Sequence, residues 1–416
     1  MPRRSLALLA VAVASIATLG GCAHSKRHTA APPVKTAGYE LPPIERGRVT
    51  AVAPEVALAA DGEEVPALPT AAHAYVALSA AEAQCLAVEY STLGNLLDRE
   101  RRAVGMNDLK KCAQPARCAV LIVLQAAARE ARNKNSADAL KLYYGLAEVE
   151  AGLDTVAASE PILADLLAKA DELKAADLER PFDRTEFERQ QLALASRRAD
   201  LEIKQAKMNA QLRALLGLPS TPNDAYFWPT EPLTVSTTPL DAEEEVGYGL
   251  ATRPQLVALR QLPNCGAVDG LDAVRELLGG THSGLGLKTK LAALKLHALC
   301  EGTSSCEPCA RQGQLAELRE SRENTIAGEI RAAVVGVVAR RRQAALAQEQ
   351  LESRGVRLSQ LEELRETGGA NFIDIATAKL HVVEAEQAVV SAVAELKRAE
   401  VELHELEGAL VAECGR

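Results

Sequence analysis

The strongest constraint on the fold is a long helical segment that occurs twice. Residues 182–217 and 373–408 align at a constant offset of 191 residues, which pairs Leu212 with Leu403 and Gly217 with Gly408. This period is too long for a solenoid repeat and indicates that one structural unit was duplicated. The sequence therefore predicts two copies of a hairpin, each built from a long helix and a return helix.

The composition favours an all-α protein. Hydrophobic residues make up 48% of the chain but aromatic residues only 3%, so the aromatic side chains that favour β-sheets are scarce. The formal net charge of -9 argues against nucleic acid as a partner, because binding it requires a basic surface.

The N-terminus resembles a bacterial lipoprotein signal. Arg3 and Arg4 precede an apolar run, and small residues lead to Cys22. We interpret residues 1–21 as the signal peptide and Cys22 as the site of lipid attachment; the alternative is an ordinary signal peptide with a chance cysteine. Ala23 in place of Asp indicates sorting to the outer membrane, so we expect a lipid-anchored protein on its periplasmic side.

The remaining chain divides into a tether, two repeats and a linker. Residues 22–72 are rich in proline and show no helical period, so we expect a disordered tether. Residues 73–218 form the first hairpin repeat and residues 219–239 a Pro-rich linker. Residues 240–412 form the second repeat, with a Cys-rich insertion at 263–313.

Start and stop signals place the helices within these repeats. Ser79 is a predicted N-cap, Pro181 separates a long helix from its return helix, and Gly217 ends the return helix. The predicted helices cover about 79–103, 116–176, 183–216, 314–366 and 372–412.

The last helix carries heptads that predict coiled-coil packing. Two series of apolar residues recur every seven positions: Ile375, Val382, Val389, Leu396, Leu403 and Leu410, and Ala378, Ala385, Ala392, Ala399 and Leu406. In the first copy, the matching first series is polar: Arg184, Gln191, Arg198 and Gln205. Heptads alone are also compatible with a simple coiled-coil spacer.

Three motifs give the chain a resemblance to the TolC-like outer-membrane efflux proteins. They are LLGLP at 215–219, TRPQL at 252–256 and GGANFIDI at 368–375, in this order and spacing. The resemblance covers about residues 75–412. It implies a homotrimer whose hairpins build a periplasmic tunnel, working with an inner-membrane pump and a periplasmic membrane-fusion adaptor.

The chain also departs from that family. The family inserts two membrane strands after each short helix, but the first gap here, residues 104–115, is too short for two strands of ~9–11 residues. The second gap, residues 263–313, has helical spacing and lacks aromatic residues. We therefore predict that the transmembrane β-strands are absent.

The hairpin turns supply candidates for the tunnel entrance. Asp374 matches the family's first acidic position, Thr377 stands where some members have a second Asp, and Asp183 is the repeat-related residue of Asp374. Three copies of Asp374 would form an acidic ring that favours cations. The alternative is an N-terminal Asp stabilised by the helix dipole.

Eight cysteines remain after Cys22, and an even number in an exported protein indicates disulfides. The candidates are Cys85, Cys112, Cys118, Cys265, Cys300, Cys306, Cys309 and Cys414. We interpret those in or beside the two gaps as disulfides that stabilise this end of the molecule. A metal site formed by His297, Cys300, Cys306 and Cys309 is the alternative, although only one Cys-x-x-Cys is present.

Signals for catalysis are weak. The segment 280–289 resembles a phosphate-binding loop, but Leu287 separates its last glycine from Lys288, and the seven histidines form no triad. We expect no enzyme activity and no cofactor. The sequence indicates a component of an efflux duct for small molecules; the alternative is a structural or adaptor coiled-coil lipoprotein that does not conduct.

Overall fold

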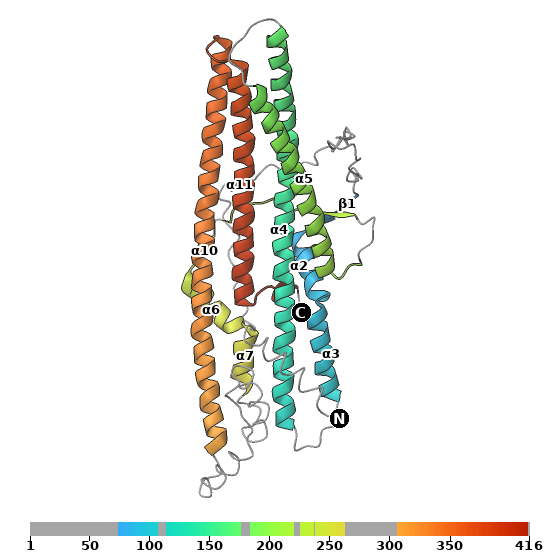
Figure 1. Ribbon diagram of the computed structural model, residues 1–416. Helices are drawn as coiled ribbons and strands as arrows, with labels where there is room; N and C mark the ends of the chain where they lie inside the picture. The colour runs from blue at the N-terminus through green and yellow to red at the C-terminus, as the bar shows by residue number, and fades with distance from the viewer. Residues whose placement is uncertain are drawn as a thin grey trace.

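The computed structural model describes residues 74–106, 114–175, 184–219, 225–236, 238–262 and 306–414. Four long helices lie side by side in an elongated body (Figure 1). They are α4 (Gln114–Ala175), α5 (Arg184–Leu215), α10 (Cys306–Glu366) and α11 (Phe372–Glu407). The predicted signal peptide, Cys22, the tether and most of both gaps lie outside the described residues.

The duplication is present in the structure. The first repeat runs through α2 (Ala80–Glu89), α3 (Thr92–Met106), α4 and α5, and the second runs through α6 (Ala242–Thr252), α7 (Pro254–Gln261), α10 and α11. Within each repeat the two long helices pack as an antiparallel hairpin, and α11 packs against α4 to join the hairpins. The predicted pair of long helical hairpins is therefore confirmed.

Local sequence fixes the ends of these helices. Ser79 and Asn371 each form a capping box, with Glu82 and Asp374 respectively, and Asp241 caps α6. Gly217 and Gly408 adopt φ of 68° and 72°, and the backbone N–H after each glycine donates to a carbonyl five residues back, as in a Schellman motif.

The structure corrects three predicted boundaries. Helix α10 begins at Cys306, eight residues before the predicted start at about 314 and within the predicted insertion. The predicted helix 79–103 divides at Tyr90, because the Ser91 hydroxyl accepts a hydrogen bond from the Gly94 N–H and restarts the helix. The last helix ends at Glu407 and not at 412, because Gly408 has the left-handed conformation. The chain continues through a turn into a short 3-10 helix, η3 (Ala412–Cys414).

A small sheet adds to the predicted all-α architecture. Strand β1 (Tyr75–Leu78) pairs in parallel with β2 (Tyr226–Pro229), with Tyr75 opposite Tyr226. Asn209 on α5 accepts a hydrogen bond of 2.6 Å from the Phe227 N–H, which fixes the sheet against the first hairpin. Three of these residues, Tyr75, Tyr226 and Trp228, meet edge to face.

Apolar clusters follow the whole length of the body. One cluster surrounds Tyr143 and Leu146 of α4 together with α2 and the end of α5. A second cluster surrounds Val334 and Val337 of α10 together with α6 and α11. These two valines are the counterparts of Tyr143 and Leu146 in the second repeat. Among the described helices, none combines the length and apolar character needed to span a membrane.

The glycine at the end of α5 provides a test of this local structure. In Gly217→Ala we expect the free energy of unfolding to fall by at least about 1–2 kcal/mol, because the left-handed conformation is unfavourable for alanine. A Cβ there would also lie 2.5 Å from Cβ of Tyr90. The control is Gly247→Ala, where a Cβ meets open space; we expect a gain of about 0.5–1 kcal/mol. Urea unfolding of both variants measures the difference, and equal losses would contradict this account.

Candidate functional site

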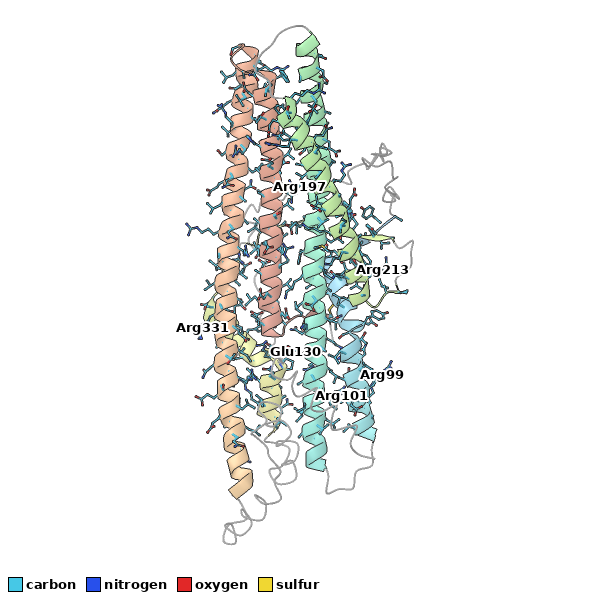
Figure 2. The ribbon with its side chains drawn as sticks, viewed as in Figure 1. Arg99, Arg101, Glu130, Arg197, Arg213 and Arg331 are labelled. Atoms are coloured by element: carbon cyan, nitrogen blue, oxygen red, sulfur yellow. A yellow bond between two sulfur atoms is a disulfide. The ribbon has the colours of Figure 1, made fainter. Side chains whose placement is uncertain are left out.

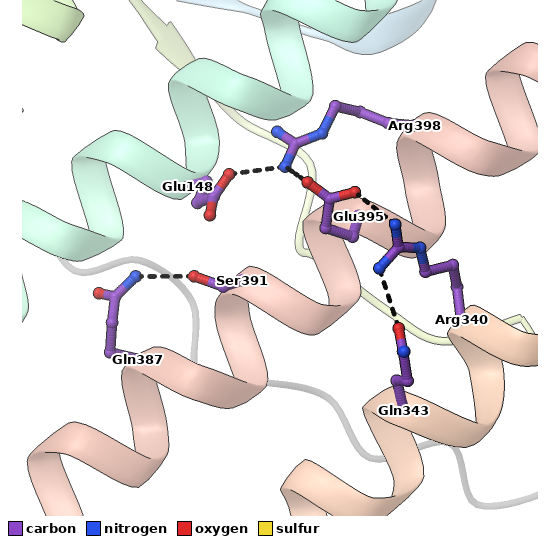
Figure 3. Close-up of polar contacts among 7 residues, drawn as sticks. All are labelled: Glu148, Arg340, Gln343, Gln387, Ser391, Glu395 and Arg398. Atoms are coloured by element: carbon purple, nitrogen blue, oxygen red, sulfur yellow. Dashed lines mark hydrogen bonds and ion pairs between the residues drawn. The ribbon is translucent and has the colours of Figure 1, made fainter.

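A polar network crosses the three long helices α4, α11 and α10 near their middle (Figure 3). The Arg398 guanidinium donates to Glu148 at 2.8 Å and to Glu395 at 2.6 Å. Glu395 also pairs with Arg340 at 3.5 Å. Burial alone would lower the pKa of Arg398, but its hydrogen bonds with Glu395 and Glu148 raise it above the ordinary value.

This network is one level of a longer polar seam between α4 and α11. Lys141, Glu148 and Thr155 lie seven residues apart on α4, and they contact Glu405 at 2.6 Å, Arg398 at 2.8 Å and Gln387 at 3.0 Å respectively on α11. Gln387 in turn donates to Ser391 at 3.2 Å. Because the helices are antiparallel, the two polar series face one another along the contact.

Helices α4 and α11 together form a wall with two faces. The face opposite the polar seam is apolar and is covered by the linker. Leu233 and Val235 of the linker pack on Ala147 of α4 and on Val389 and Val393 of α11. These valines lie roughly half a turn from Ser391 and Arg398, at 3.6 residues per turn. The wall therefore has one side covered by the linker and one side lined with half-buried charges.

A second set of polar contacts joins α4 to α5. The predicted polar series of the first copy supplies its members: Arg198 donates to Glu160 at 2.6 Å, and Arg184 pairs with Asp171. Gln205 donates to Glu150 at 2.7 Å and to the Tyr75 hydroxyl at 3.0 Å, which connects α4, α5 and β1.

Glu150 and its neighbour Asp154 have unusual acidity. Burial raises the pKa of Glu150 to about 7, although its hydrogen bond with Gln205 opposes the shift, and the charge of Asp154 adds to it. Burial also raises the pKa of Asp154 to about 6. Burial and then the charge of Glu150 raise the pKa of Tyr75 to about 12. No cationic side chain contributes to the shift of Glu150 or Asp154, so ionisation of these two carboxyls opposes folding.

The predicted entrance residues are only partly described. Asp374 lies just after the α10–α11 turn, where its side chain accepts a hydrogen bond of 3.2 Å from the Asn371 N–H. This contact is part of the α11 capping box, and the role of Asp374 at a tunnel entrance stays a prediction. Thr377 lies one turn further along α11 and is half-buried, whereas Asp183 lies outside the described residues.

The cysteines are distributed over both ends of the chain. Cys85 of α2 and Cys414 of η3 form a disulfide, away from the two gaps, and Cys118 is also disulfide-bonded. His297, Cys112, Cys265 and Cys300 lie outside the described residues, while Cys306 and Cys309 belong to the first turn of α10. In the described part of the chain, no group of three or more potential ligands could hold a metal ion.

Sequence reasoning missed the residues of the polar seam. The predicted heptads of α11 consist of apolar residues, and these identify only its covered face. A second signal was available, since Ser391, Arg398 and Glu405 also lie seven apart. Polar residues in a heptad phase of their own indicate a second contacting face.

The acidity of Glu150 predicts a pH dependence. A carboxyl whose pKa is raised on folding favours the folded state below its unfolded pKa of about 4.5, and this contribution is lost as pH rises through its folded pKa of about 7. We therefore expect the free energy of unfolding to increase from pH 8 to pH 5.

In Glu150→Gln the rise in the free energy of unfolding from pH 8 to pH 5 should be smaller by roughly 2–3 kcal/mol, because a shift of one pKa unit corresponds to about 1.4 kcal/mol. Urea titrations at both pH values measure it. Exposed Glu349→Gln is the matched control and should retain the wild-type pH dependence. An unchanged pH dependence in Glu150→Gln would contradict the assignment.

Comparison with known proteins shows the fold. No protein-family model and no curated protein sequence matches the chain. The MtrE outer membrane channel of Neisseria gonorrhoeae is 15% identical with a TM-score of 0.55, over 80% of this chain and 88% of that one. The CmeC outer membrane channel of Campylobacter jejuni is 12% identical with a TM-score of 0.54, over 79% and 85%. The outer-membrane channel OprN is 14% identical with a TM-score of 0.57, over 79% and 90%. The chain therefore has the helical fold of the TolC-like outer-membrane channels.

Proposed function

We propose that this chain is a subunit of a periplasmic and outer-membrane duct that exports small molecules. In this proposal three copies form the duct, Cys22 anchors each copy to the outer membrane by lipid, and an inner-membrane pump and a periplasmic adaptor deliver the substrate. The fold shared with outer-membrane channels supports the role. The proposed assembly rests on the burial of equivalent residues in the two repeats, which differs at specific positions.

Each long helix of the second repeat can be compared with its counterpart 191 residues earlier. Ala147 of α4 and Ala394 of α11 are fully buried in one cluster where the two repeats meet. Their counterparts are Val338 of α10 and Ile203 of α5, which are 51% and 58% exposed. Within the chain, α4 and α11 pack against one another at these alanines. The equivalent faces of α10 and α5 are exposed and do not pack against one another.

The short helices repeat this relation at an offset of 162 residues, which pairs the caps Ser79 and Asp241. Helix α7 packs against α10 and also against α4 of the other repeat. Its residues Gln255 and Ala258 are buried, whereas their counterparts Leu93 and Leu96 on α3 are 58% and 54% exposed. The face of α3 that would meet the other repeat is open.

These open faces lie on opposite edges of the molecule. Helices α3 and α5 form one edge and α10 the other (Figure 1). Arg99 projects outward at the first edge and Arg331 at the second (Figure 2). Placing α10 of one copy against α5 and α3 of the next repeats a single head-to-tail contact, and such contacts form a ring when the rotation between copies closes. The resemblance to TolC-like proteins supports three copies.

The polar seam between α4 and α11 then supplies the lining of the duct. The linker covers the other side of the wall, so the charged side is the one available to a solute. Its acids and bases are largely paired, as with Glu148, Arg398 and Glu395. A lining of paired charges supports passage of varied small molecules without strong retention of one sign of charge.

A charge exchange tests the contact between copies. Val338→Glu alone and Ile203→Lys alone should each shift trimers towards monomers, because a charge placed in an apolar contact is desolvated. The double variant should recover trimers, since the introduced carboxylate of one copy would face the introduced ammonium group of its neighbour. Because the two positions lie on opposite edges of one chain, recovery can arise only between copies. Native mass spectrometry measures the assembly, and a wild-type chain that remains monomeric at micromolar concentration would contradict the proposal.

Export of a fluorescent dye tests conduction in a strain that lacks the gene. Wild type should restore export, while the Val338→Glu variant should not and the double variant should. If deletion leaves export unchanged while the neighbouring pump is active, the role as a duct fails. The structural or adaptor lipoprotein would then be the function that remains.

The entrance supplies a finer test. We expect Asp374→Asn to alter export of cations, because it removes one negative charge per copy from the tip of the duct. Loss of a charge at a helix N-terminus costs only about 0.3–1 kcal/mol, so the variant should remain folded. Glu349→Asn, at an exposed site on α10, is the control. Equal export by both variants would exclude Asp374 from selection.

A further inference from the structure

The segment that follows α11 packs against the other repeat. After the turn at Gly408, the chain buries Ala409, Leu410 and Val411. Leu410 is only 1% exposed and belongs to the apolar cluster of α2 and α4. The last residues of the second repeat therefore complete the core of the first.

Hydrogen bonds fix this segment from both sides. The Leu410 N–H donates to Asn133 Oδ1 of α4 at 3.2 Å, and Leu410 O accepts from Gln84 of α2 at 2.8 Å. The Asn133 amide also donates to Glu405 O at 2.8 Å, at the end of α11. A buried backbone without these partners would be costly, so the segment has one favourable position.

A disulfide then fastens the end of the segment. Cys414 of η3 is bonded to Cys85, the residue after Gln84 on α2, across a sequence separation of 329 residues. Both cysteines are half-buried, so part of each residue is exposed to solvent. Reduction would leave Leu410 held only by its packing and by the side chains of Gln84 and Asn133.

We propose that residues 408–414 and the Cys85–Cys414 disulfide form a redox-sensitive clasp that locks the second repeat onto the first. Closure transfers two electrons and two protons from the Cys85 and Cys414 thiols to an oxidised dithiol oxidoreductase, whose own disulfide is reduced. A dithiol such as dithiothreitol reverses the step and becomes a cyclic disulfide. The clasp belongs to the single chain, so it does not rest on the proposed transport function.

The test compares the full chain in oxidised and reduced form with Cys85→Ser/Cys414→Ser. Hydrogen exchange of the backbone amides of residues 409–412 reports the segment directly. We expect exchange at least about tenfold faster in the reduced protein and in the double variant, because local opening no longer works against a covalent bond. We also expect Tm to fall by about 5 °C or more, since removing a native disulfide is strongly destabilising.

The double variant also separates this bond from that of Cys118. Reductant should leave exchange at residues 409–412 unchanged in the double variant, even if it affects other regions. Wild-type exchange in both the reduced protein and the double variant would overturn the proposal. If the double variant does not fold, the single variant Cys414→Ser, which also lacks this bond, takes its place. Native mass spectrometry of the same samples reports copy number, so failure of the clasp and failure of the trimer give different results.

Discussion

The contact between α4 and α11 is the interaction on which the rest of the structure depends, because it joins two hairpins that are each nearly complete. Fully buried Ala147 and Ala394 allow the helices to approach closely. Paired charges such as Lys141 with Glu405 and Glu148 with Arg398 then set the register. A shift by one helical turn would leave these half-buried groups unpaired, which costs more than each pair contributes when made.

The different sequences of the two return helices follow from their positions. Helix α11 lies between α4 and α10, so it needs contacting residues on two sides, and it carries both an apolar and a polar heptad series. Among the described residues, the long helix that packs against α5 is α4. The series of α5 that faces α4 includes Arg198 and Gln205, and it meets Glu160 and Glu150. The polar side chains of this edge helix therefore have partners within the chain, and the helix tolerates contact with water.

Much of the fold could be predicted from the sequence, because its determinants are local. The N-cap at Ser79 and the glycine end of α5 each rest on a few neighbouring residues, and the duplication is visible as two long aligned segments. The misplaced end of the last helix had the same kind of signal, since the offset of 191 already paired Gly408 with Gly217. The sheet was different, because β1 and β2 are short and pair Tyr75 with a residue 151 positions away. The raised pKa of Glu150 could not be predicted either, because it arises mainly from burial in the folded chain.

The composition of the α10 edge bears on the proposed contact between copies. Gly328 and Gly336 lie within this long helix, where glycine is less favourable than alanine by about 0.5–1 kcal/mol. A Cβ at either position would meet open space within the chain, so packing inside the molecule does not require glycine there. Val335 lies between these glycines in the sequence and Val338 follows them, and both valines are exposed. The equivalent residues of α4 are Tyr144 and Ala147, respectively. Gly328, Val335 and Val338 lie on one face of the helix at 3.6 residues per turn, and a small residue beside apolar ones permits the close approach of another helix. That face of α10 thus has the composition of a buried helix contact, and the complementary open face within this chain is that of α5.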